Sequence, residues 1–336
     1  MPHLLDVPGT IRWIRRDGIE NILAGMVRYL ESDLLRWEEF EKVPRLASHS
    51  PHGVIELMPT SDGSLYSFKY VNGHPHNPAR GLQTVTAFGV LADVDNGYPI
   101  LFAEMTLLTA LRTAAMSALA ARELARPGAR VHALIGAGSQ AEFQALAMRT
   151  MLGIDRLRVL DLDEAAVEKV RRNLVPLGFE IHAASSIEDV LEGADVVTTC
   201  TADKARAAVL HSEQVRPGMH LNAIGGDCPG KTELDPAILE DARVVVEYAP
   251  QTRVEGEIQQ LPEDFEVTEL WRILAGDASG RTSDQEVTVL DSVGFALGDF
   301  SALRCALDAT EGTDLLGWVD LVADPDDPKD LFSLVT

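Results

Sequence analysis

The residues best suited to chemistry begin with a glycine loop. Gly136 and Gly138 belong to a Gly-x-Gly-x-x-Ala pattern that ends at Ala141, after the apolar run 131–135. A helix-forming stretch follows the loop, and Asp161 stands twenty residues beyond Ala141. Such a loop lets backbone N–H groups approach a pyrophosphate at a helix N-terminus, and the carboxylate can bind ribose hydroxyls. Because that carboxylate would repel a 2′-phosphate, the pattern favours NAD over NADP.

Polar residues follow two apolar runs further along the chain, at 198–204 (Thr-Thr-Cys-Thr-Ala-Asp-Lys) and at 222–231. In an open α/β sheet, ligands bind beyond the carboxyl ends of the strands, so these segments are candidate site residues. Gly225 and Gly226 allow a flat ring to approach the backbone, and Asp227 beside it could move a proton as a hydride moves. An ordinary turn uses the same residue types, so spacing alone leaves both interpretations of Asp227 open.

Three cations in the first third of the chain stand in apolar surroundings. Arg45 lies in a short apolar patch, Lys69 alternates with Phe68 and Tyr70, and Arg112 lies within an apolar helical stretch. Buried cations need anions, and an arginine can bind a carboxylate through two parallel hydrogen bonds. Three unrelated surface cations would fit the pattern at least as well.

The apolar patterns that must position these residues differ along the chain. A helical stretch at 18–40 precedes β-like stretches at 53–58, 65–71 and 83–91, separated by turn residues, which predicts an antiparallel sheet. An alanine-rich helix follows from 107 to 125, and Pro127-Gly128 ends it. The last twenty-odd residues form an acidic tail interrupted by prolines.

From residue 130 onward, short apolar runs alternate with helical segments. The runs occupy 131–135, 157–160, 179–182, 195–199, 220–224, 243–246 and 287–290. This alternation is typical of a parallel sheet flanked by helices. The sequence therefore predicts an α/β fold, with a doubly wound (Rossmann) NAD-binding domain and an α+β domain that contains the antiparallel sheet. After the glycine loop, the spacing of Ser139 and Glu142 predicts a capping box.

The charge balance disfavours several classes of function. The 336 residues include 52 acidic and 29 basic side chains, for a formal net charge of −23. We expect no nucleic-acid or membrane partner, because both favour basic surfaces. No apolar run is long enough to span a bilayer and no targeting segment begins the chain, so we expect a cytoplasmic protein. The spacing of the three cysteines and nine histidines predicts no metal site.

Longer motifs are similar to those of a known family. They lie at 45–50 (Arg-Leu-Ala-Ser-His-Ser), 53–59 (Gly-Val-Ile-Glu-Leu-Met-Pro), 68–75, 110–115, 225–234 (Gly-Gly-Asp-Cys-Pro-Gly-Lys-Thr-Glu-Leu), 255–262 (Glu-Gly-Glu-Ile-Gln-Gln-Leu-Pro) and 291–296 (Asp-Ser-Val-Gly-Phe-Ala). Through them the chain resembles the ornithine cyclodeaminase/mu-crystallin family over nearly its whole length. The resemblance implies a homodimer with a substrate-binding and dimerisation domain (1–113 plus 315–336) and an NAD-binding domain (114–314).

The same resemblance implies a reaction. Its enzymes convert L-ornithine to L-proline and ammonia with NAD reduced and reoxidised within one turnover, which belongs to ornithine and arginine catabolism and to proline biosynthesis. Three cations would hold the substrate carboxylate, namely Arg45, Lys69 and Arg112. Asp227 would donate and accept protons, Glu56 would position an amine, and Val293 would line the substrate site.

The resemblance also implies which residues bind the cofactor, and they come from both predicted domains. They are Thr84, Arg112, Gly136, Gly138, Ser139, Gln140, Asp161, Thr201, Ile224, Gly225, Gly226, Asp227, Lys231 and Ser292.

Other functions compete with this one. A cyclodeaminase for lysine or another diamino acid, or a reductase of cyclic imines, would share the motifs, and one methylene changes binding by only about 1–3 kcal/mol. A binding protein without catalysis would lack the acid–base group or the cations, which are all present here. A hydroxy-acid dehydrogenase would need a histidine base, and none follows the two polar strand ends.

Overall fold

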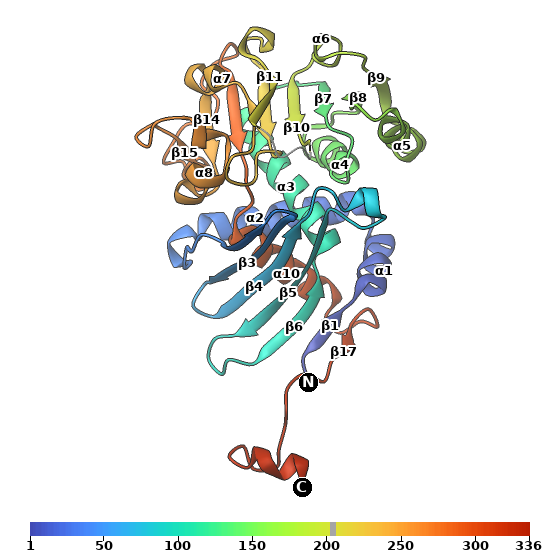
Figure 1. Cartoon of the computed structure of the whole chain (residues 1–336), viewed down its shortest axis with the longest axis vertical. Coiled ribbons are helices and arrows are strands. Elements are labelled where there is room, and N and C mark those ends of the chain that lie inside the picture. The colour runs from blue at the N-terminus through green and yellow to red at the C-terminus, as the bar shows by residue number, and fades with distance from the viewer. Residues whose placement is uncertain (202–205) are drawn as a thin grey trace.

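The computed structural model describes residues 1–201 and 206–336, and its two large β-sheets are joined by helix α3 (Thr106–Leu124) (Figure 1). This helix is apolar on all sides, and Leu108, Leu111 and Leu119 are fully buried, as expected for a helix enclosed by other elements. It packs against α2 (Ile19–Leu35), α4 (Ala141–Leu152) and α10 (Ala296–Thr310), and it contacts strands of both sheets. The predicted helix at 107–125 is therefore confirmed.

Within the described residues, the first sheet contains seven strands in the order β17-β1-β6-β5-β4-β3-β2. These are β17 (Gly317–Trp318), β1 (His3–Leu5), β6 (Pro99–Glu104), β5 (Val85–Asp93), β4 (Leu65–Gly73), β3 (Gly53–Ser61) and β2 (Leu46–Ser50). Neighbouring strands are antiparallel except β1 and β6, which are parallel. The predicted antiparallel sheet is confirmed, and β1, β2, β6 and β17 are additions to it.

Alternation along β4 places its side chains on two faces of this sheet. Ser67, Lys69 and Val71 are buried, while Tyr66 and Tyr70 point to the other, more exposed face. Helix α10 covers the inner face by packing on β3, β4 and β5. The ammonium of Lys69 consequently lies inside the molecule, where it requires an anionic partner.

The described part of the second sheet has eight strands, all parallel, in the order β15-β14-β16-β12-β10-β7-β8-β9. These are β15 (Thr268–Glu269), β14 (Arg243–Val246), β16 (Thr288–Asp291), β12 (His220–Ala223), β10 (Val196–Thr199), β7 (Val131–Ile135), β8 (Arg156–Leu160) and β9 (Glu180–Ala183). A separate parallel pair joins β11 (Arg206–Leu210) to β13 (Thr232–Leu234). The seven predicted runs all form strands, and β15 was not predicted.

Helices connect the strands of the second sheet. They include α4, α5 (Glu164–Leu174), α6 (Ile187–Val190), α7 (Pro236–Asp241), α8 (Ala249–Glu255) and α9 (Leu270–Leu274). The chain runs outward from β7 through β8 to β9 and then returns to the other side of β7 with β10. The carboxyl ends of β7 and β10 therefore form the point where the strand order reverses, which is where such sheets bind ligands.

The first strand of the chain and the strand that follows α10 both lie at the edge of the first sheet. Helix α1 (Val7–Asp17) follows β1, and β17 pairs with β1 after α10. The last residues, 319–336, form an arm that extends away from the body in Figure 1, with the apolar side chains of Leu331, Phe332 and Val335 exposed. The domain boundaries at 113/114 and 314/315 stay a prediction. In the described residues, no helix combines the length and the apolar character needed to cross a membrane.

Candidate active site

The glycine loop has the geometry that its sequence predicts. Gly136 follows β7 with a φ of +107°, and a Cβ atom there would lie 2.7 Å from the carbonyl oxygen of Cys200. Gly138 is exposed, and no atom would contact a Cβ within 4 Å, so the space above this part of the backbone is open. The carboxylate of Asp161 accepts a hydrogen bond from the backbone N–H of Ala137 at 2.6 Å. The acidic residue after β8 thus lies against the loop.

The predicted capping box at the next helix is wrong. Helix α4 is capped at Gln140 without a side-chain hydrogen bond. Glu142 instead accepts a hydrogen bond from Lys169 Nζ of α5 at 2.9 Å, and Lys169 also donates to the carbonyl oxygen of Gly138 at 2.9 Å. Pairing with a charged partner from a neighbouring helix therefore replaces the local cap, and Ser139 stays exposed beside the loop.

The loop that follows β12 rests on buried carboxylates. A Cβ at Gly225 would lie 1.9 Å from Glu233 Oε2, and one at Gly226 would lie 2.5 Å from Glu257 Oε1. Only glycine fits at these two positions as the loop is packed. The side chain of Asp227, the next residue, is 55% exposed, and its Oδ1 lies 3.5 Å from Lys231 Nζ. The Asp227 carboxylate is therefore accessible to a ligand beyond the end of β12.

Thr201, which follows β10, is joined to this loop from two sides. Its backbone N–H donates to Glu233 Oε1 at 3.0 Å, and its hydroxyl donates to the same oxygen. Its carbonyl oxygen accepts a hydrogen bond from Lys231 Nζ at 3.0 Å. Residues 202–204, which belong to the predicted polar strand end, lie outside the described residues. Thr201, Lys231 and Asp227 are therefore neighbours at the carboxyl edge of the sheet.

Two more acidic groups, Glu257 and Asp291, accept hydrogen bonds from backbone segments that pack against this loop. Glu257 accepts hydrogen bonds from the backbone N–H groups of Glu233 (2.8 Å) and Leu234 (3.0 Å). The two oxygens of Asp291, at the end of β16, accept from the N–H groups of Glu257 and Ile258, each at 2.9 Å. Burial raises the pKa of Asp291 to about 7, and burial together with the charge of Asp291 raises the pKa of Glu257 to about 8.

Two of the predicted cations share one carboxylate oxygen. Lys69 Nζ lies 2.8 Å from Asp299 Oδ1, and Arg112 Nε lies 3.0 Å from the same atom. Side chains of all three are at most 6% exposed. Burial lowers the pKa of Lys69 to about 8, although the charge of Asp299 opposes this shift. The guanidinium of Arg112 also borders Gly294, where a Cβ would lie 2.7 Å from Nη1.

Arg45 reaches the same place from the segment before β2. Its Nη1 lies 3.1 Å from Glu56 Oε2, and its Nε lies 3.0 Å from Glu255 Oε2. Its Nη2 donates to the carbonyl oxygens of Val293 and, at 2.7 Å, Gly294. Lys69, Arg112 and Arg45 therefore meet around the loop that follows β16, and the alternative of three unrelated surface cations is wrong.

The other predicted positions are divided between the two sheets. Ser292 is buried, and its hydroxyl donates to the carboxylate of Glu247, which also accepts from the backbone N–H of Phe295 at 3.0 Å. Thr84 lies just before β5, and its carbonyl oxygen accepts from the backbone N–H of His74 at 2.8 Å. In the described part of the chain, no hydrogen bond or ion pair links Thr84 to Asp227 or to the glycine loop.

Sequence reasoning did not single out the acidic partners of these groups. They are Glu233, Glu247, Glu255, Glu257, Asp291 and Asp299. Four of them lie inside the quoted motifs, where Glu255 and Glu257 flank one glycine. The signal for Asp299 was an acidic residue within the apolar helix 296–310, because a buried carboxylate needs a cationic partner.

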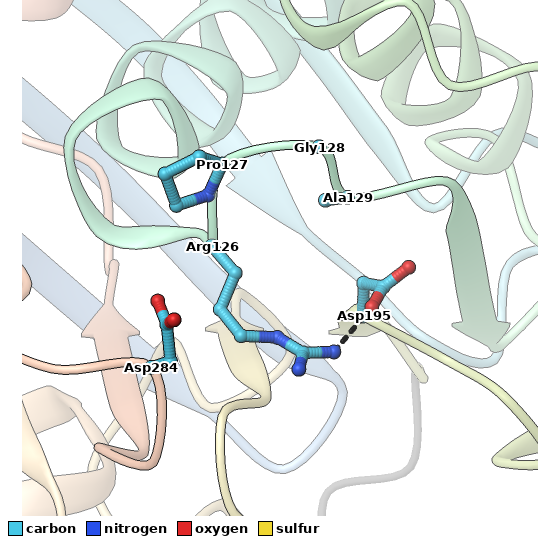
Figure 2. A pocket seen from close by; sticks show the side chains of 6 residues that line it. All are labelled: Arg126, Pro127, Gly128, Ala129, Asp195 and Asp284. Carbon is cyan, nitrogen blue, oxygen red and sulfur yellow. Dashed lines mark hydrogen bonds and ion pairs between the residues drawn. The ribbon is translucent and has the colours of Figure 1, made fainter.

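A small pocket lies at the other end of the second sheet. Figure 2 shows its lining residues, which are Arg126, Pro127, Gly128, Ala129, Asp195 and Asp284. Arg126 Nη2 is 2.6 Å from Asp195 Oδ1, just before the amino ends of β7 and β10. This pocket is therefore at the edge opposite to the glycine loop and Asp227. Among the described residues, no three His, Cys, Asp or Glu side chains are grouped so that they could hold a metal ion.

The buried acids predict a pH-dependent stability difference. Because the pKa values of Asp291 and Glu257 in the folded chain (about 7 and about 8) exceed their ordinary values of 3.8 and 4.5, the folded chain binds more protons between these limits. Their contribution to stability is complete below about pH 4 and is lost as the pH rises through about 7 to 8. We expect the stability advantage of wild type over Asp291→Asn, measured by urea unfolding, to shrink as the pH rises from about 4 to about 7 and to level off above that. A difference that is independent of pH would contradict this assignment.

Comparison with known proteins places this site in a family. The model of the Ornithine cyclodeaminase/mu-crystallin family matches residues 11–314. The ornithine cyclodeaminase of Agrobacterium fabrum is 58% identical over 318 residues, which cover 95% of this chain and 90% of that protein. The ornithine cyclodeaminase of Brucella suis is 56% identical over 331 residues, 98% of this chain and 92% of that protein.

Solved structures of related proteins share the fold of this chain. One similar structure is that of a lysine cyclodeaminase, which concerns its recognition of L-lysine, L-ornithine and L-2,4-diamino butyric acid. Its sequence is 32% identical to this one, and the two folds match with a TM-score of 0.91 over 98% of both chains. An archaeal alanine dehydrogenase dimer with bound NAD is 29% identical with a TM-score of 0.81, over 92% of this chain and 95% of that one. The family match over most of the chain and the identities above one half show that this protein belongs to the Ornithine cyclodeaminase/mu-crystallin family.

Proposed function

We propose that this protein is an NAD-dependent ornithine cyclodeaminase that converts L-ornithine to L-proline and ammonia. The observation that carries the proposal is the meeting of Arg45, Lys69 and Arg112 beside the loop after β16, at the same carboxyl edge of the second sheet as Asp227. The identity of more than half of the aligned residues to two ornithine cyclodeaminases supports the choice of substrate.

NAD is the cofactor that the site fits. The open backbone at Gly138 and the exposed Ser139 leave room for a pyrophosphate at the start of α4, and the Asp161 carboxylate stands beside the loop. We assign the dinucleotide to Gly136, Gly138, Ser139, Gln140 and Asp161, and its nicotinamide end to Thr84, Arg112, Thr201, Ile224, Gly225, Gly226, Asp227, Lys231 and Ser292. When bound, NAD takes up a hydride from the substrate α-carbon and returns it to the cyclic imine.

The three cations hold the substrate carboxylate in this proposal. The ammonium of Lys69 has three N–H donors and each guanidinium has five, so their acidic partners leave donors free. Asp299 occupies Nε of Arg112 and one donor of Lys69, and it keeps both cations in place. We also assign Val293 to the substrate site, and the hydrogen bond from Arg45 to its carbonyl oxygen supports this assignment. A carboxylate held by several charged donors fixes the orientation of the α-carbon.

Asp227 moves protons at the α-carbon end of the substrate. Its carboxylate lies at the end of β12 and contacts only Lys231 among the described ion pairs, so it is free to accept a proton from a substrate ammonium. The side-chain amine attacks the α-carbon and forms the ring C–N bond. Asp227 returns its proton to the departing α-amine, and ammonia leaves as the old C–N bond breaks. Glu56, beside Arg45, positions an amine. Positioned general acids and bases contribute about 10²–10⁴ in rate.

The test of the function is product analysis. We would incubate the protein with L-ornithine and catalytic NAD, and measure L-proline, ammonia and NADH together. Equal amounts of proline and ammonia, in excess of NAD and without net NADH, are expected. Stoichiometric NADH without proline would instead identify an amino-acid dehydrogenase. Turnover of L-lysine in preference to L-ornithine would favour a lysine cyclodeaminase on the same scaffold.

Replacing Asp227 by asparagine should separate catalysis from binding. The amide cannot accept the proton, so we expect proline formation by Asp227→Asn to fall by about 10²-fold or more. NAD affinity, measured by quenching of tryptophan fluorescence, should change little, because the loop backbone is unaltered. Undiminished proline formation would remove Asp227 from the mechanism.

A second copy of the chain is the partner we propose for the outer face of the first sheet. This face carries exposed apolar side chains on β3 and β5, the two neighbours of β4, including Ile55, Leu57 and Phe88. Leu57 pairs across the strands with Tyr70, whose ring stacks on Phe88 at 5.0 Å. A contiguous apolar face of this kind is typical of a protein interface. The homodimer, the cytoplasmic location and a role in proline formation from ornithine are parts of this proposal.

A charge on this face should dissociate the dimer. Phe88→Glu would bury an unpaired carboxylate in the interface, so we expect a monomer in analytical ultracentrifugation at micromolar concentration. Val175→Glu is the matched control. Val175 is as exposed as Phe88, but it lies in the turn that follows α5, a helix that connects strands of the second sheet. A monomeric wild type, or a dimeric Phe88→Glu, would contradict the proposed interface.

A further inference from the structure

Glu255 is the first residue of the motif at 255–262, but the proposed function gives it no role. It is the last residue of α8, and its side chain is only 9% exposed. Its Oε2 lies 3.0 Å from Arg45 Nε, yet in the described residues this oxygen accepts no hydrogen bond and that nitrogen donates none. A buried carboxylate oxygen without a hydrogen bond is unfavourable unless another donor reaches it.

The surroundings of Glu255 contain more negative than positive charge. Glu56 and Glu255 both pair with Arg45. Burial alone would lower the pKa of Arg45, but the pKa is raised because of three carboxylates, Glu56, Glu255 and Asp227. Burial raises the pKa of Glu255 to about 7, and the charges of Glu56 and Asp227 add to this rise while Arg45 opposes it. Because Lys231 pairs with Asp227, one guanidinium is left to serve the two carboxylates of Glu56 and Glu255, and this cluster lacks a cation.

The neighbouring cluster has the opposite imbalance. Lys69 and Arg112 share one carboxylate, that of Asp299, which leaves one positive charge in excess. The charges of Arg112 and Arg45 both help to lower the pKa of Lys69, so the two clusters adjoin. The site therefore has a cationic end, suited to a carboxylate, and an end rich in carboxylates.

We propose that Glu255 binds the side-chain ammonium of the substrate and thereby selects diamino acids over monoamino acids. The substrate class is an L-α-amino acid with a protonated amine at the end of a short side chain. Its α-carboxylate neutralises the cationic end, and its distal ammonium donates to the Glu255 carboxylate. This inference deepens the proposed function and rests on it.

The test compares two ligands that differ only in the distal ammonium. L-Norvaline has the carbon chain of L-ornithine but no δ-amine. For Glu255→Gln with NAD, we expect KM for L-ornithine to rise roughly 10- to 100-fold, the effect of losing a charged hydrogen bond. The inhibition constant of L-norvaline should change less than about threefold, because L-norvaline does not carry that ammonium.

The result distinguishes this role from a structural one. If Glu255 only holds Arg45 in place, Glu255→Gln will weaken the binding of L-ornithine and of L-norvaline equally, and the inference is overturned. An unchanged KM for L-ornithine overturns it as well. A wild type that forms no proline from L-ornithine would instead reject the proposed function. The kinetic measurements therefore distinguish a failure of this inference from a failure of the proposed function.

Two further variants sharpen the experiment. Glu255→Asp keeps the charge but withdraws it by one methylene, so the ratio of kcat/KM for L-lysine to that for L-ornithine should rise about 3- to 10-fold. A residue that merely supports the fold would not alter that ratio. Glu286→Gln is the matched control, since Glu286 pairs with Arg243 at 2.9 Å, outside the site, and should leave both substrates unchanged. Equal melting temperatures would show that all three variants are folded.

Discussion

The burial of charge between the two sheets is the constraint on which the rest of this structure depends. Lys69, Arg112 and Asp299 come from β4, α3 and α10, and one carboxylate oxygen serves both cations. Leaving one member of a buried pair without its partner costs about 3–5 kcal/mol, so these three elements must pack in one arrangement. The inner face of the first sheet is thereby fixed against the helix that leads into the second sheet. The cations of one sheet consequently stand at the carboxyl edge of the other.

A related constraint shapes the loops at that edge. Backbone N–H groups outside the sheet ladders need hydrogen-bond acceptors, and here buried carboxylates provide them. Asp291 accepts from the N–H groups of residues 257–258, Glu257 from those of 233–234, and Glu233 from that of Thr201. This chain of acceptors runs from the end of β16 to the end of β10 and passes directly beneath Gly225 and Gly226. Holding the loop by fixed dipoles and charges pre-organises Asp227 without restricting its own side chain.

Sequence reasoning succeeded where the information is local. The strand, glycine turn and helix around Gly136 are consecutive, and the parallel strands are continuous apolar runs, so both were predicted. The capping box failed because Lys169, from another helix, competes for Glu142. The meeting of Lys69 with Asp299, 230 residues apart, depends on how α10 packs on β4, which no local pattern encodes. The resemblance named the cations and Glu56 in advance, but it did not supply the other acidic partners, Glu255 and Asp299.

Substrate choice in this fold must reside in side chains rather than in the backbone. The chain matches the fold of an alanine dehydrogenase and that of a lysine cyclodeaminase over at least 92% of its length. A monoamino acid is neutral overall and a diamino acid is a cation, so the two differ by one charge placed several ångströms from the α-carbon. Arg45 faces two carboxylates, Glu56 and Glu255, whereas Lys69 and Arg112 share one, Asp299. Lys231 pairs with Asp227, so the charges of the site balance overall but one end is locally negative and the other locally positive. In the proposed function, a distal ammonium neutralises the locally negative end at Glu56 and Glu255, whereas a monoamino acid leaves a buried carboxylate there without its own cation. That difference can select the substrate without any change of fold.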